Sequence, residues 1–237
     1  VDTLNEILLL YGMKKAKKPG DVKHPFGYGR ELYFWAFIVA LLVFALGAIV
    51  SILQGIYHII QPEEMQNPMI NYIVLGIAIL CEGFSWSVAL KTFRKQKGNM
   101  GYFEAFRRSK DPTTFTVLFE DTAALIGLVI ALVGIFLAHQ LNIPELDGVA
   151  SILIGVVLAV SAWFLARETK GLLLGETADP KLRENVLNIA QQDAAVFSAN
   201  GVLTEQMGAH QVIASLSLEF KDDLTSDQSE ACVNRIE

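Results

Sequence analysis

Cysteine is scarce in this chain of 237 residues, and its two cysteines, Cys81 and Cys232, lie far apart. They form no C-x-x-C pair and no cluster with histidine, so the sequence supports neither a disulfide framework nor a structural zinc knuckle. An excess of basic charge is lacking as well, because the formal net charge is −6. Nucleic-acid-binding proteins carry a basic footprint, and we therefore expect no nucleic-acid partner.

Charged residues make up only 19% of the chain, whereas apolar residues make up 52%. This composition is too apolar for an ordinary soluble domain of this size, and it predicts a lipid bilayer as the surroundings. Neither an H-E-x-x-H pattern nor a nucleophile paired with a base is recognisable, so we do not expect an enzyme.

Four apolar stretches predict membrane-spanning helices of roughly 20 residues or more each. The second reaches that length only by including Glu82, and the third begins at Asp111-Pro112 and therefore contains Glu120 and Asp121. A shorter apolar stretch, residues 1–11, is interpreted as the end of an earlier helix, and we expect residues to precede Val1. The predicted spans cover about 32–60, 68–90, 112–138 and 148–166.

Basic residues alternate from loop to loop and predict the orientation. The loops 12–30 and 91–111 are rich in lysine and arginine, whereas the loops 61–67 and 139–147 contain none. We therefore place the first pair of loops, and everything after Arg167, in the cytoplasm.

Charge returns after about residue 176, and residues 176–237 read as a small cytoplasmic domain, with residues 1–175 forming the membrane domain. The spacing of apolar residues predicts a helix, two strands and a final helix. Two strands make a marginal sheet, so we expect a further strand beyond Glu237 or a partner chain. The predicted elements are a helix over 180–192, strands over 202–207 and 212–220, and a helix from Thr225 or Ser226 towards Glu237.

Acidic residues on three predicted helices lie at nearly one depth in the membrane. Glu120 lies about 12 Å from the cytoplasmic helix end, Asp121 and Glu82 about 13.5 Å, and Asp2 about 15 Å. A carboxylate in hydrocarbon is energetically costly and is retained mainly beside a cavity, a partner or an ion. The shared depth of these carboxylates therefore predicts a cation site. On an ideal helix Glu120 and Asp121 point about 100° apart, so both can touch a common cavity, but we do not expect a symmetric pincer. Glu82 is open to three readings: a protonated structural acid, a proton relay or an ion contact.

The segment His24-Pro25-Phe26-Gly27-Tyr28-Gly29-Arg30-Glu31 resembles the loop between the second and third helices of the cation diffusion facilitators. Together with FEDTAALIGL around Asp121, it is most similar to the zinc transporter 9-like subgroup. The resemblance implies an α-helical polytopic membrane protein: a six-helix transporter fold whose N-terminal part is missing here, followed by a truncated cytoplasmic α+β ferredoxin-like domain. It also implies a homodimer in the bilayer that exchanges divalent metal, often zinc, for protons and needs no cofactor.

Carried over residue by residue, the resemblance assigns Asp2 to the second acid of the family's second-helix pair and Asp121 to the aspartate of its fifth-helix H-x-x-x-D pair. The histidine position of that pair is Val117, a departure that leaves one metal ligand unaccounted for. Glu120 is our candidate replacement and Asn5 a weaker one.

Two further metal sites of the family are not expected. The loop site keeps Asp21 but has Tyr28 where the family has histidine, and the cytoplasmic domain offers only His210. We therefore predict no metal at the loop, and a cytoplasmic domain that mediates dimerisation instead of sensing zinc.

The sequence thus predicts an exporter of a divalent cation in exchange for protons, in a bacterial inner membrane. Zinc is the expected ion, although the lost histidine should relax the preference towards iron, manganese or cobalt. The alternative is a non-transporting membrane adaptor or regulator that binds a partner through its cytoplasmic domain.

Overall fold

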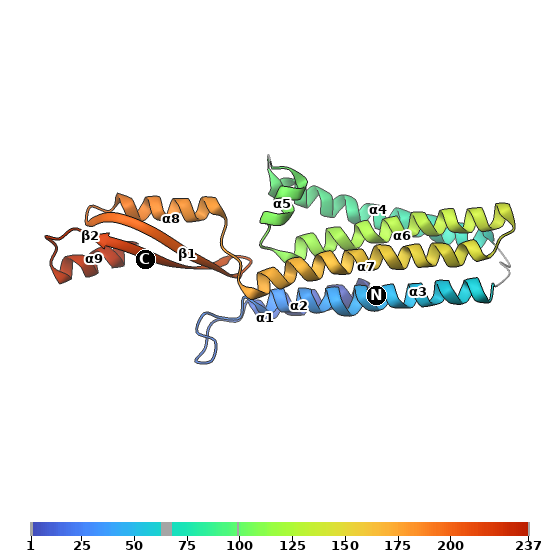
Figure 1. Cartoon of the computed structure of the whole chain (residues 1–237), viewed down its shortest axis with the longest axis horizontal. Coiled ribbons are helices and arrows are strands. Elements are labelled where there is room, and N and C mark those ends of the chain that lie inside the picture. The colour runs from blue at the N-terminus through green and yellow to red at the C-terminus, as the bar shows by residue number, and fades with distance from the viewer. Residues whose placement is uncertain (1, 63–67, 99, 237) are drawn as a thin grey trace.

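The structure is a computed structural model that describes residues 2–62, 68–98 and 100–236. Figure 1 shows a long bundle of helices joined at one end to a small α+β domain. The bundle contains α1 (Asp2–Ala16), α2 (Glu31–Val39), the π-helical turn η1 (Ala40–Phe44), α3 (Ala45–Ile60), α4 (Pro68–Lys97), α5 (Tyr102–Arg108), α6 (Pro112–Leu141) and α7 (Glu145–Leu174). The C-terminal domain contains α8 (Pro180–Gln192), β1 (Val196–Gly208), β2 (Gln211–Phe220) and α9 (Ser226–Ile236).

Among the described residues, four helical segments are long and apolar enough to cross a membrane, and each overlaps one of the predicted spans. They cover 31–60, 69–95, 115–141 and 145–174. The last runs well past the predicted end at residue 166, because Arg167, Glu168 and Lys170 continue the helix. It ends only where Gly175 takes a left-handed φ of 99°, a conformation that favours glycine.

Local capping explains where two of the helices begin. The Asp111 carboxylate accepts a hydrogen bond from the backbone N–H of Thr113 at 3.0 Å, with Pro112 at the first helical position of α6. Asp179 accepts from the backbone N–H of Lys181 at 2.8 Å, with Pro180 opening α8. Both starts follow the preference for Asp at the cap and Pro just inside the helix.

Helix α5 lies within residues 91–111, which the sequence indicated as a loop. Its seven residues carry no long apolar pattern, but Phe106 packs edge-on against Phe115 of α6, with ring centroids 5.1 Å apart. The helix is therefore stabilised by this tertiary contact more than by a local signal.

Helices α3 and α7 pack backbone to backbone through glycine. A Cβ added at Gly55 would lie 2.6 Å from the carbonyl oxygen of Gly148, so only a residue without a side chain fits there. The Ser51 hydroxyl donates to the Ser151 carbonyl at 2.7 Å across the same interface. Helix α4, by contrast, packs mainly against α6, and none of its spanning window is buried.

The C-terminal domain has the predicted order of helix, strand, strand and helix. Strands β1 and β2 pair antiparallel, with Val202 opposite Leu216, and α9 covers the sheet through the buried Cys232. The predicted first strand, 202–207, is too short, because β1 begins at Val196. Polar residues and register shifts between 196 and 201 interrupt the alternation that marks a strand. Within the described residues the sheet has two strands.

Candidate metal centre in the helical bundle

Asn5 and Glu120 meet in the bundle, although they come from helices far apart in the sequence. Asn5 lies on α1 with 1% of its surface exposed, and its Nδ2 donates a hydrogen bond to Oε1 of Glu120 on α6. Two of the predicted site residues are therefore brought together. The contact joins α1 to α6.

Two buried oxygen atoms near this contact make no hydrogen bond to any described residue. They are Oδ1 of Asn5 and Oγ1 of Thr116, whose residue is 1% exposed. Thr116 lies four residues before Glu120 and so on the same face of α6, one turn away. A buried polar atom without a partner costs about 1–3 kcal/mol, which a bound cation or a water molecule would offset. Amide, hydroxyl and carboxylate oxygens are ligands for hard divalent cations.

Asp121 is directed to a different helix. It is 7% exposed, and its Oδ2 accepts a hydrogen bond from the Ser85 hydroxyl on α4 at 2.9 Å. The neighbouring contact joins the same helices, since the Trp86 indole N–H donates to the Thr122 hydroxyl at 3.0 Å. Glu120 and Asp121, which are predicted to point in different directions, thus contact different helices: Glu120 contacts α1, and Asp121 contacts α4.

Helix α4 contributes more to this region than the sequence indicated. Neither Ser85 nor Trp86 was identified as a site residue from the sequence. Both follow Glu82 by one helical turn, and this i, i+3, i+4 spacing was the signal that could have found them.

The side chain of Asp2 is not among the side chains that the structure describes, so its assignment as a metal ligand stays a prediction. Among the described side chains, no group of three or more His, Cys, Asp or Glu is arranged to hold a metal. A cation site formed by the described residues must therefore use amide or hydroxyl oxygens as well as carboxylates.

Asp21 in the loop between α1 and α2 is engaged in hydrogen bonds. Its Oδ1 accepts from the backbone N–H groups of Lys23 and His24 at 2.9 and 2.8 Å, and its Oδ2 accepts from the Tyr28 hydroxyl at 2.6 Å. These bonds, chiefly the one from Tyr28, hold the pKa of the Asp21 carboxyl well below its usual range. Tyr28 thus binds the aspartate directly at the position where the resemblance implied a histidine.

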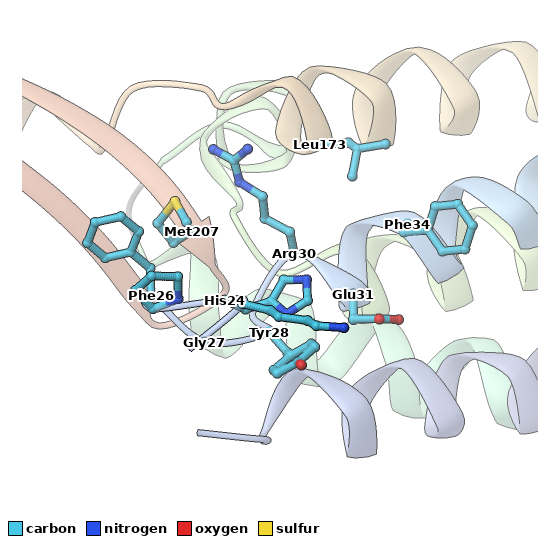
Figure 2. A pocket seen from close by; sticks show the side chains of 11 residues that line it. His24, Phe26, Gly27, Tyr28, Arg30, Glu31, Phe34, Leu173 and Met207 are labelled. Carbon is cyan, nitrogen blue, oxygen red and sulfur yellow. The ribbon is translucent and has the colours of Figure 1, made fainter. Parts of the chain in front are cut away.

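The C-terminal domain is attached to the basic end of the bundle by polar contacts. Arg30 pairs with Glu205 on β1, and Lys110 Nζ lies 2.6 Å from Oε2 of Glu176. Gln211 donates to the backbone carbonyl of Phe26 at 2.9 Å. Figure 2 shows a cavity at this junction, with Arg30 between the loop and Met207 of β1.

Four membrane spans, buried acids between helices and a small α+β domain define a multi-pass membrane protein of the transporter type. Residues 1–174 match the cation efflux transmembrane domain, and the chain belongs to this cation efflux family, the cation diffusion facilitators. The family transports cations and is not a family of enzymes. This confirms the family and fold class expected from the sequence.

Three relatives illustrate the similarity. Metal tolerance protein C4 of Arabidopsis thaliana is 28% identical over 94% of this chain and 49% of its own length. The mitochondrial proton-coupled zinc antiporter SLC30A9 of Mus musculus is 28% identical over 92% of this chain and 39% of its own length. The cation-efflux pump FieF of Citrobacter koseri is 24% identical over the whole chain and 74% of its own length. The chain thus spans half or less of the length of the first two relatives.

Proposed function

We propose that the protein exports a divalent metal cation, zinc in the first place, from the cytoplasm in exchange for protons. The observation that carries the proposal is the partly buried contact between Asn5 and Glu120, together with buried oxygens of Asn5 and Thr116 that have no hydrogen-bond partner among the described residues. The name of the mouse relative, a proton-coupled zinc antiporter, supports the ion and the coupling. Iron, manganese and cobalt are the further candidates.

In this proposal Glu120, Asn5 and Thr116 supply oxygen ligands from α1 and α6, and Asp121 and Asp2 supply carboxylates to the same ion. Glu82, on α4 one turn before Ser85, remains a proton relay or a structural acid. A carboxylate binds the cation only when deprotonated, so loading the ion releases protons, and protonation from the far side expels the ion. The coupling therefore needs no cofactor.

The orientation and assembly are proposed with the function. The basic end of the bundle, with the C-terminal domain, faces the cytoplasm by the positive-inside rule. The protein forms a homodimer, with residues 176–237 as its dimerisation domain and residues 1–175 as its membrane domain. A bacterial inner membrane is the proposed location.

Proton flux in liposomes tests the proposal. Zinc added to one side should draw protons across from the opposite side in the wild type, and Asp121→Asn and Glu120→Gln should each abolish that flux. Glu6→Gln is the matched control, because Glu6 is an exposed acid next to Asn5 on α1 and should leave the flux intact. Unaltered flux in the Asp121 and Glu120 variants would contradict the assignment.

A non-transporting adaptor is the second candidate. Val117 at the histidine position favours it, as does the lack, among described side chains, of three His, Cys, Asp or Glu residues around one point. A folded wild-type protein that shows neither zinc binding nor metal-driven proton flux would favour the adaptor.

A further inference from the structure

The loop that joins α1 to α2 has a fixed shape. Asp21 ties its tip together by accepting hydrogen bonds from the backbone of Lys23 and His24 and from the Tyr28 hydroxyl. The imidazole of His24 also packs on the Tyr28 ring, with centroids 4.4 Å apart. Figure 1 shows this loop projecting to one side of the bundle, away from the body of the C-terminal domain.

The tip of this loop exposes apolar side chains. Val22 is fully exposed, and Phe26 is 58% exposed. Because burying such side chains removes about 25 cal/mol of unfavourable free energy for each Å² of apolar surface, a rigid tip that presents them suits an apolar contact surface.

The same segment is strongly basic. Its lysines are all exposed, and its single acid, Asp21, is already paired with Lys18 at 3.5 Å. Basic clusters next to a membrane helix attract anionic lipid headgroups. The lysines are Lys14, Lys15, Lys17, Lys18 and Lys23.

A cavity of about 560 Å³ lies between this loop and the ends of two spanning helices. Figure 2 shows His24 and Arg30 beside it, with Phe34 of α2 and Leu173 of α7 towards the bundle. The Nε atom of Arg30 is buried and has no hydrogen-bond partner among the described residues, although another nitrogen of this side chain pairs with Glu205. Glu31, the acid in the lining, accepts a hydrogen bond from the Trp35 indole at 2.9 Å.

We propose that this cavity and loop bind an anionic phospholipid of the adjacent leaflet. Lys23 and the guanidinium of Arg30 donate to the phosphate, and the acyl chain starts along Phe34 and Leu173, which lie in the first and last turns of spanning segments. Val22 and Phe26 enter the interfacial layer of the bilayer. A second copy of the chain fits this face poorly, because a two-fold contact would place the lysine cluster against itself.

Lipid retention measured by native mass spectrometry tests the proposal. The protein is extracted from bilayers of mixed phosphatidylglycerol and phosphatidylcholine, and the lipids that remain bound are counted. The wild type should retain phosphatidylglycerol in preference to phosphatidylcholine. Lys17→Gln combined with Lys23→Gln should weaken that preference by about fivefold for each lysine removed. Val22→Ser combined with Phe26→Ser should weaken it without any change of charge.

The matched control is Lys91→Gln combined with Lys95→Gln, which removes two exposed lysines from α4 at the same end of the bundle. It should retain the lipid as the wild type does. If the two double lysine variants lost the preference for phosphatidylglycerol equally, general surface charge would explain the effect, and the proposal would be overturned. Displacement of the lipid by inorganic phosphate, or spontaneous cross-linking of Phe26→Cys between two copies with retention unchanged, would overturn it as well.

Discussion

At the scale of single residues, Val117 stands at the position where the resemblance to the family implies a histidine. It lies one turn before Asp121, where a histidine would add a nitrogen ligand. In its absence the described ligand candidates, Asn5, Thr116, Glu120 and Asp121, all offer oxygen. Oxygen ligands suit harder ions, whereas imidazole suits zinc.

We therefore expect Val117→His to shift the preference of the protein towards zinc over manganese. The imidazole of the new histidine should raise the ratio of zinc-driven to manganese-driven proton flux. The ratio should rise about tenfold if this ligand favours zinc binding over manganese binding by about 1.4 kcal/mol. Val117→Leu, which changes the volume without adding a ligand, is the control. An unchanged ratio in the histidine variant would argue against a metal beside Asp121.

A second prediction at this scale concerns Asp193, which clamps α9. Arg235 donates to the Asp193 carboxylate from Nε and Nη2, both at 2.9 Å, and the backbone N–H of Ala195 donates to it as well. These hydrogen bonds, chiefly those from Arg235, hold the pKa of Asp193 well below its usual range. A carboxyl with a lowered folded pKa stabilises the fold fully above its unfolded pKa of about 4, and this stabilisation is lost as the pH falls towards the folded pKa.

Asp193→Asn should therefore loosen α9 at neutral pH but not in strong acid. The buried thiol of Cys232 reports this opening, because it reacts only when α9 separates from the sheet. In a Cys81→Ser background, labelling with a dithiodipyridine should be faster in Asp193→Asn than in its parent above about pH 4, and the two rates should converge below it. A rate difference that grows as the pH falls would refute the clamp.

At the scale of elements, strong local signals predicted the structure best. The Asp-Pro pair at 111–112 located the start of α6, because an N-cap and a following proline act within a few residues. Helical spacing of apolar residues predicted α8. Helix α5 and the first half of β1 depend on tertiary contacts, the Phe106–Phe115 pair and pairing with β2, which leave no clear periodic pattern.

In the candidate site, too, some features could be predicted from local sequence and others depend on tertiary contacts. The acids of α6 and their divergence followed from helical spacing alone. The contacts to Ser85 and Trp86 depend on how α4 is rotated against α6, and their position one helical turn after Glu82 was the signal for that rotation.

The α3–α7 interface provides a prediction for an element pair. Gly55→Ala should lower the free energy of unfolding by about 1–3 kcal/mol, because its new methyl group meets the Gly148 carbonyl and forces the helices apart. Gly76→Ala is the matched control, since a Cβ at this position on α4 meets nothing within 4 Å. Thermal unfolding in one detergent compares the two, and equal midpoints would contradict the close packing.

At the scale of the whole molecule, charged pairs join the bundle to the C-terminal domain. Lys110 is only 17% exposed where it contacts Glu176, directly after the end of α7. Its ion pair therefore holds the start of the link between the two parts.

Lys110→Glu and Glu176→Lys should each speed proteolysis of the link around residues 175–179, and the double variant should restore much of the resistance. The expected coupling is about 1 kcal/mol, as for a partly exposed ion pair. Additive effects in the double variant would show that the two side chains do not stabilise each other.

The glycine contact between α3 and α7 has a consequence for how the bundle can rearrange. The carbonyl oxygen of each of Gly55 and Gly148 faces the other glycine where a side chain would stand, so one helix has little room to slide or roll on the other. Helix α4 has no such interlock and is joined to α6 through Ser85, Asp121, Trp86 and Thr122. Helix α6 also packs closely on α7, through Gly134 against Ala150. An alternating-access cycle would thus keep α3, α6 and α7 as a stationary frame, and opening to the two sides in turn would come from rocking of α4.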